Sequence, residues 1–298
     1  MKKYIIIGIM AFIITMPIAG SSDIIPINDK KEISSMNFST YNFSHTVIAE
    51  YVTTTDCPHC PTASNQLWSI YNSEDYDFYF VTLVGDKNLK NIKSRIIDLK
   101  VESVPDVYFD GRYIQKTGKQ SNEQIYRNAI VQSGVRDVVD IDIDVTVTWE
   151  GNSKLTITIN VQNNEEEEYA GHLRVYIVEP ESRWKDANNN PYHFGVLAIP
   201  MDRSLAFSKG NARSLGYTYT FSKTWVGSRL GFGDITKDNI MVLAVVFDPD
   251  TDYAVQVAAA EPTTRTRNLF EYLLSRPISY LLKFFRELRI FPYLLQLI

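Results

Sequence analysis

The two cysteines of this chain stand two residues apart, in the segment Cys57-Pro58-His59-Cys60. A pair at this spacing can alternate between dithiol and disulfide, and the thiolate is the form that attacks another disulfide. A helix that starts at the pair would place backbone amides and the positive end of its dipole near the sulfurs, and a protonated His59 would add positive charge. The spacing therefore predicts that Cys57 attacks and that Cys60, one turn deeper, resolves the mixed disulfide.

Two other interpretations of the pair remain open. Cys57, His59 and Cys60 could provide three ligands to a zinc ion, with His45 as a distant fourth, although the chain has no second C-x-x-C. An inert structural disulfide is the other possibility, but a bridge that closes so short a loop adds little stability. The favoured redox interpretation needs no metal and no other cofactor.

The segments around the dithiol alternate between strand and helix patterns. Asp110-Gly111 between two β-rich runs is typical of a hairpin, and the Ser121/Gln124 capping-box pattern predicts the start of a helix that ends at Gly134. The expected elements are a strand at 47–52, a helix from the dithiol to about residue 71, a strand at 76–84, a helix with Leu89, Ile92, Ile96 and Leu99 on one face, the hairpin, and the final helix.

After Gly134 the hydrophobic period changes to two. Apolar residues alternate with polar ones over 139–149, which places Asp140, Asp142 and Asp144 on a solvated strand face. Further β-rich runs follow at 155–161, 173–178, 194–199, 217–221, 241–247 and 253–258, without helices between them. This pattern predicts an all-β, antiparallel, immunoglobulin-like sandwich domain at 135–262.

Both ends of the chain differ from its middle. Lys2 and Lys3 precede an apolar run over 4–18, so residues 1–22 are expected to be a signal peptide or an N-terminal anchor, followed by a linker at 23–45. Export would place the protein outside the cytoplasm, secreted or attached to a membrane. The apolar tail at 263–298 carries charges throughout and is expected to be an amphipathic helix that contacts a membrane or packs on the protein. A net charge of −5 argues against nucleic acid as a partner.

The stretch 46–134 resembles the thioredoxin superfamily. The resemblance rests on the strand end Glu50-Tyr51-Val52, the Cys57-Pro58-His59-Cys60 segment and Ser103-Val104-Pro105 before a hairpin strand. It implies an α/β thioredoxin-like domain in which Pro105 is cis, Val104 offers backbone groups to the substrate chain, and Glu50 acts as proton acceptor for Cys60. The Pro-His pair is similar to that of DsbA-type periplasmic oxidants, although Asp56 stands where thioredoxins have Trp.

The second half extends this resemblance. Cys60-Pro61 together with the β-rich runs 241–247 and 255–258 is similar to the Omp28-related exported proteins. We therefore expect an extracytoplasmic thiol–disulfide oxidoreductase that acts on protein thiols as an oxidase, isomerase or exchange enzyme, together with a redox partner protein. The alternative is a surface-anchored binding or structural protein that works through its β-sandwich and uses the thioredoxin fold as a scaffold.

Overall fold

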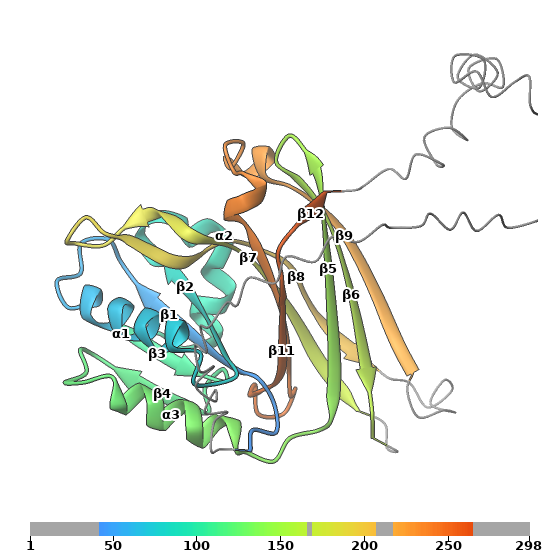
Figure 1. Ribbon diagram of the computed structural model, residues 1–298, viewed down its shortest axis with the longest axis horizontal. Helices are drawn as coiled ribbons and strands as arrows, with labels where there is room; N and C mark the ends of the chain where they lie inside the picture. Colours follow the sequence, from blue (N-terminus) through green and yellow to red (C-terminus); the bar gives the residue numbers. More distant parts are fainter. Residues whose placement is uncertain (1–41, 166–168, 207–216, 265–298) are drawn as a thin grey trace, which may run out of the picture. The chain divides into compact units, whose positions relative to one another are not determined.

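The computed structural model describes residues 42–165, 169–206 and 217–264 (Figure 1). The expected signal segment 1–22, linker residues 23–41 and nearly all of the tail 263–298 lie outside these residues. Within the described ranges, no helix combines the length and apolar character needed to cross a membrane.

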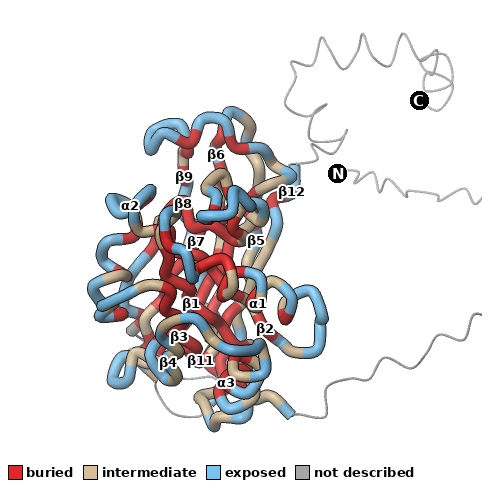
Figure 2. The backbone as a smooth tube through the Cα atoms, turned by 90° about the vertical axis from the view of Figure 1, so that its left-hand side faces the viewer, coloured by how far each residue is buried: buried red, intermediate tan, exposed pale blue. Residues whose placement is uncertain are grey.

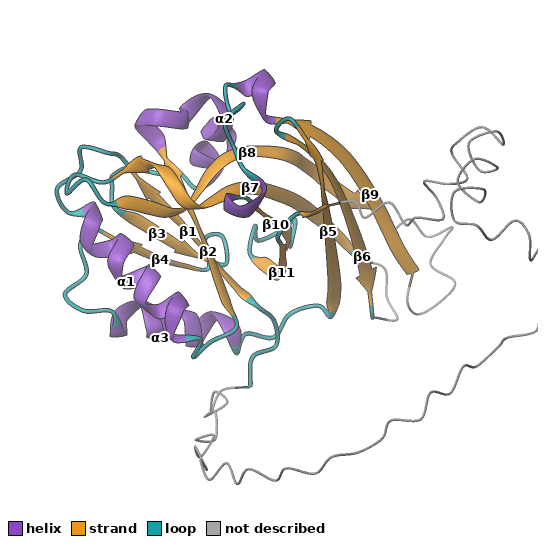
Figure 3. Ribbon diagram, turned by 45° about the horizontal axis from the view of Figure 1, so that its top comes forward, coloured by secondary structure: helices purple, strands orange, loops and turns teal. Residues whose placement is uncertain are grey.

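The first half of the described chain alternates strands and helices, as the sequence predicts. The elements are β1 (Val47–Thr53), α1 (Cys60–Ser73), β2 (Phe78–Val84), α2 (Gly85–Asp98), β3 (Asp106–Phe109), β4 (Ile114–Thr117) and α3 (Gln124–Gly134). Figure 3 shows α1 and α3 on one side of these strands and α2 on the other. β1 and β2 are buried on both faces and are accordingly almost continuously apolar.

The second half consists of strands, and each predicted β-rich run is part of one. They are β5 (Ile141–Gly151), β6 (Lys154–Asn163), β7 (Ala170–Lys185), β8 (Pro191–Ala206), β9 (Tyr217–Val226), β10 (Met241–Phe247), β11 (Ala254–Ala260) and β12 (Thr263–Thr264), with short 3-10 helices at Gly227–Leu230 and Lys237–Asn239. Asp142 and Asp144 are exposed on β5, which confirms the alternation expected for that strand.

The strands form two sheets, and one of them runs through both halves of the chain. Its order is β11-β10-β7-β8-β2-β1-β3-β4, and the smaller sheet has the order β12-β5-β6-β9. The halves join where β8 pairs in parallel with β2, at Thr82 and Gly195. The structure is thus mixed α/β with two sheets. It differs from the expected separation of the halves, because one layer of the β-rich half continues into the sheet of the first half.

Alternating residues of β7 and β10 face two different hydrophobic cores. Leu243, Val245 and Phe247 of β10 belong to the core shared with β1 and β2, whereas Val242, Ala244 and Val246 belong to the core shared with the smaller sheet. Successive side chains of a strand point to opposite faces, so a strand between two layers is apolar at nearly every position. Figure 2 shows the buried residues concentrated along these central strands.

Three local predictions have different outcomes. The hairpin is confirmed: β3 and β4 are antiparallel, and Asp110 and Gly111 both have positive φ. The capping box is wrong, because Glu123 is the N-cap of α3 and makes no side-chain cap hydrogen bond. Leu89 is 48% exposed, so it does not share the buried face of α2 with Ile92.

The last residues of the expected linker belong to the fold. Phe43 packs against the first core and stacks on Tyr76. His45 is buried, and its Nε2 lies 2.8 Å from Oδ2 of Asp110 in the β3–β4 turn. Residues 43–45 therefore fix the start of the chain against the hairpin.

Candidate active site

The two cysteines form a disulfide in the turn between β1 and α1. Their Cα atoms are 5.4 Å apart, and the N–H of Cys60 donates to the carbonyl of Cys57. Cys57 is 6% exposed and Cys60 is fully buried, while Pro58 and His59 between them are exposed. Of the two cysteines, only Cys57 therefore retains any exposure to solvent.

Helix α1 starts later than the sequence suggests. His59 is its N-cap and Cys60 its first residue, so Cys57 lies in the preceding turn and not in the first helical turn. No side chain caps the helix; of its first two residues, Cys60 donates its N–H to the Cys57 carbonyl and Pro61 has no N–H. The helix dipole can still stabilise a thiolate there, through the amino end that carries Cys60.

Pro105 and Val104 lie at the same end of the sheet as the dithiol turn. The Val104–Pro105 peptide bond is cis. Because Val52 near the end of β1 pairs with Asp106 at the start of β3, the two antiparallel strands bring the segment before β3 beside the turn that leaves β1. The register thus places the Val104–Pro105 segment at the same end of the sheet as the turn that carries Cys57, His59 and Cys60.

Glu50 does not belong to this group, and its expected role as proton acceptor for Cys60 is corrected. The neighbouring residue Tyr51 donates its hydroxyl to the Cys60 carbonyl at 2.8 Å. Side chains of adjacent strand residues point to opposite faces, so Glu50 faces away from the dithiol. There its carboxylate binds Arg95 of α2 at 2.7 and 2.5 Å and accepts the Tyr176 hydroxyl at 2.5 Å.

The electrostatics of Glu50 agree with a structural role. Burial raises the pKa of this carboxyl group, but the charge and hydrogen bonds of Arg95 outweigh burial and leave the pKa below the ordinary value of 4.5. Glu50 therefore remains ionised at neutral pH, and its oxygens are occupied by Arg95 and Tyr176.

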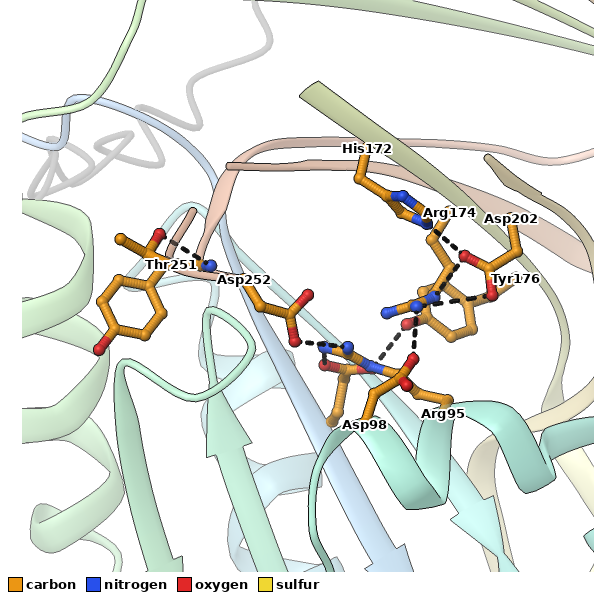
Figure 4. A network of polar contacts seen from close by, with 10 residues as sticks. Arg95, Asp98, His172, Arg174, Tyr176, Asp202, Thr251 and Asp252 are labelled. Carbon is orange, nitrogen blue, oxygen red and sulfur yellow. Dashed lines mark hydrogen bonds and ion pairs between the residues drawn. The ribbon is translucent and has the colours of Figure 1, made fainter. Parts of the chain in front are cut away.

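Arg95 and Arg174 extend this ion pair into a network between the halves of the chain (Figure 4). Arg95 Nη1 lies 3.0 Å from Oδ2 of Asp252 in the β10–β11 loop. Arg174 of β7 binds Asp98 of α2 at 2.8 Å and Asp202 of β8 at 3.1 Å. Both guanidinium groups also lie over the ring of Phe247, at 4.7 and 5.3 Å.

Sequence reasoning missed the residues that hold Glu50 and the residue that holds the dithiol turn. Arg95 could have been found, because it lies three residues after Ile92 and four before Leu99 on the buried face of an amphipathic helix. A charged residue on such a face requires a partner. No comparable signal identifies Tyr176 of β7, which donates to Glu50, or Tyr192 of β8, which donates to the Thr54 carbonyl, because long-range strand pairing sets both contacts.

The geometry gives the zinc interpretation no additional ligands. In the described parts of the chain, no cluster of three or more histidine, cysteine, aspartate or glutamate side chains could hold a metal ion. His45, the expected fourth ligand, is occupied by Asp110. His172 binds Asp202, and His193 stacks on Trp68 with ring centroids 3.7 Å apart.

Comparison with known proteins shows a similar fold but no family. No protein-family model and no curated protein sequence matches the chain. Among solved structures, HBP35 of Porphyromonas gingivalis has a TM-score of 0.59 and 14% identity, over 77% of this chain and 80% of that one. A domain of the outer membrane lipoprotein Omp28 from the same organism has a TM-score of 0.30 and 16% identity, over 44% of this chain and 96% of that one. The likeness to HBP35 concerns the fold alone.

Proposed function

We propose that the protein is a thiol–disulfide oxidoreductase that acts on protein thiols through the Cys57/Cys60 couple. The observation that carries the proposal is the disulfide itself: the only two cysteines of the chain form it at the start of α1, and only Cys57 is accessible. Such a bridge closes too short a loop to add much stability, which favours a chemical role over a structural one.

The arrangement of the first half supports a thioredoxin-like assignment. The dithiol turn follows the central strand β1 and precedes α1, and the Val104–Pro105 segment enters the sheet beside it. We assign the second half to an immunoglobulin-like sandwich whose larger layer is continuous with the thioredoxin-like sheet. In this assignment the domain boundary lies between α3 and β5, near residue 135.

The proposed exchange proceeds in two balanced steps. A substrate thiolate attacks Sγ of Cys57, the Cys57–Cys60 bond breaks, and Cys60 leaves as a thiolate that takes up a proton. A second substrate thiolate then attacks the substrate sulfur of the mixed disulfide and releases Cys57. The substrate gains a disulfide and the protein gains two electrons, which a redox partner protein must remove before the next cycle. Read backward, the same steps reduce or rearrange a substrate disulfide.

Location and further partners form part of the proposal. The predicted signal segment or anchor at 1–22 and a redox-active disulfide both favour an extracytoplasmic protein, secreted or attached to a membrane. We propose that the tail at 263–298 provides any membrane contact. The acidic net charge favours protein substrates over nucleic acid.

Trapping of a substrate provides the test. With a disulfide-bonded protein as substrate, Cys60→Ser is expected to accumulate a mixed disulfide on Cys57: the Cys57 thiolate attacks the substrate disulfide, one substrate sulfur leaves as a thiolate, and the resolving thiol is missing. The matched variant Cys57→Ser should trap nothing and should lose turnover of a glutathione–protein mixed disulfide. Turnover that is unchanged in Cys57→Ser would reject the proposal and leave the binding or structural interpretation.

A further inference from the structure

A tyrosine from the β-rich half lies directly behind the dithiol turn. Tyr192 of β8 is fully buried, and its hydroxyl donates to the carbonyl of Thr54 at 2.9 Å. The same hydroxyl lies 2.9 Å from Oγ1 of Thr53, the last residue of β1. Tyr192 therefore connects a strand 138 residues farther along the chain to the turn that carries Cys57.

The Thr54 carbonyl is also the acceptor for Cys57. The N–H of Cys57 lies 3.5 Å from this oxygen, so the attacking cysteine and Tyr192 share one acceptor. Cys60 is held in a parallel way, because Tyr51 donates to its carbonyl. The hydroxyl of Tyr51 lies 3.1 Å from Oγ1 of Thr53. The rings of Tyr51 and Tyr192 meet edge to face, with their centroids 6.2 Å apart. Two connected tyrosines thus bind the Cys60 carbonyl directly and the Thr54 carbonyl that accepts from Cys57.

We propose that Tyr192 is a positioning residue that sets the redox equilibrium of the Cys57/Cys60 couple. This inference rests on the proposed function and makes the β-rich half a part of the redox site. A fixed turn holds the two sulfurs at bonding distance in the dithiol form, which raises their effective concentration toward one another and favours the disulfide. A turn released from Tyr192 holds them less well, so the disulfide becomes less stable and more oxidising.

The hydroxyls act as donors and not as bases. Burial raises the pKa of Tyr192 to about 12. Burial, followed by the neighbouring Tyr192, raises the pKa of Tyr51 well above its ordinary value. Both hydroxyls keep their protons at neutral pH, so their effect on the couple comes through the backbone that they hold.

Tyr192→Phe removes the hydroxyl and keeps the ring, which makes it the primary test. We expect the equilibrium constant for disulfide formation against glutathione to fall about three- to tenfold, since a hydrogen bond between neutral groups contributes up to roughly one factor of ten. Tenfold corresponds to about 30 mV toward a more oxidising potential for this two-electron couple. Tyr51→Phe, which frees the Cys60 carbonyl, should shift the couple in the same direction.

Tyr176→Phe is the matched control. Tyr176 is a fully buried tyrosine on the adjacent strand β7, and its hydroxyl binds Glu50 on the face away from the dithiol. We expect this variant to lower the free energy of unfolding without moving the redox equilibrium. A Tyr192→Phe protein that loses stability like Tyr176→Phe but keeps the wild-type equilibrium within twofold would overturn the proposal.

Two further outcomes are separable. If Tyr192→Phe does not fold, Thr53→Val removes the oxygen that both tyrosine hydroxyls contact and should also destabilise the disulfide; an unchanged equilibrium there counts against the proposal equally. In every variant the Cys57/Cys60 couple is intact, and its equilibrium is measured against glutathione without a protein substrate. Absence of turnover on protein thiols therefore rejects the proposed function, whereas an unshifted equilibrium in the variants rejects only the role of Tyr192.

Discussion

Glu50 and Arg95 form a bidentate ion pair in which neither side chain is exposed to solvent. The guanidinium donates from Nε and Nη2 to the two carboxylate oxygens, at 2.7 and 2.5 Å. Arg95 also lies over the ring of Phe247 and reaches Asp252, so the pair connects β1 and α2 with the β-rich half (Figure 4). A charge at this depth is tolerated only while its partner is present.

Loss of Arg95 should therefore be far more costly than loss of an ordinary arginine. We expect Arg95→Met to lower the free energy of unfolding by about 3–5 kcal/mol, because it leaves the Glu50 carboxylate buried without its counter-ion. The double variant with Glu50→Gln should recover part of this loss. Urea denaturation measures both. Arg127→Met is the control, since Arg127 pairs with the more exposed Asp75 and should lose about 1 kcal/mol or less. Equal losses at the two sites would contradict the prediction.

The Glu50 carboxyl group should also make stability depend on pH. Burial raises its pKa, but Arg95 lowers it further, so the native pKa lies below the ordinary value of 4.5. As the pH falls, the unfolded chain therefore takes up the proton before the native protein does. The contribution of Glu50 to the free energy of unfolding is complete above the ordinary pKa of 4.5 and is lost as the pH falls from there through the lower native pKa. The stability difference between the wild type and Glu50→Gln should shrink as the pH is lowered from about 5 to about 3.

Denaturation curves across this range test the sign of the effect. Asp142→Asn, on the exposed face of β5, serves as the control and should follow the wild type. A difference between wild type and Glu50→Gln that stays constant with pH would show that Glu50 is not held ionised by Arg95.

Local signals predicted the elements of the fold well. Asp110 and Gly111 specify a turn with two positive φ values, and the alternation along β5 matches its burial. The joining of the two halves could not be predicted in the same way. β2 and β8 pair at one position, Thr82 with Gly195. No local pattern in the sequence around either residue indicates that its strand pairs with the other.

The same distinction applies to the site. The C-x-x-C spacing marks Cys57 and Cys60 as candidates, and the resemblance to the thioredoxin superfamily marks Pro105, whose peptide bond is cis as that resemblance implies. The surroundings of Glu50 are not local: its partners are 45 and 126 residues away in sequence. Strand alternation places its side chain on the opposite face of the sheet from the dithiol.

The tip of the β3–β4 hairpin should be intolerant of any added side-chain atom. A Cβ on Gly111 would lie 2.2 Å from the carbonyl oxygen of Asp252, whereas a Cβ on Gly118 would meet nothing within 4 Å, although both residues have positive φ. We expect Gly118→Ala to lose about 1–2 kcal/mol from the backbone conformation alone. Gly111→Ala should lose about 1–3 kcal/mol more from the steric clash. Thermal unfolding compares the two, and a smaller loss at Gly111 would refute the close contact.

His59 offers the final test, because it is the exposed N-cap of α1 and lies between the two cysteines. A positive imidazolium beside the sulfurs would favour the Cys57 thiolate. In the reduced protein, His59→Ser should therefore slow alkylation of Cys57 severalfold at low salt. Because the site is exposed, the effect should weaken at about 1 M salt. His172→Ser, which removes a histidine bound to Asp202, is the control. Equal alkylation rates for His59→Ser and this control at low salt would assign the reactivity of Cys57 to the start of the helix alone.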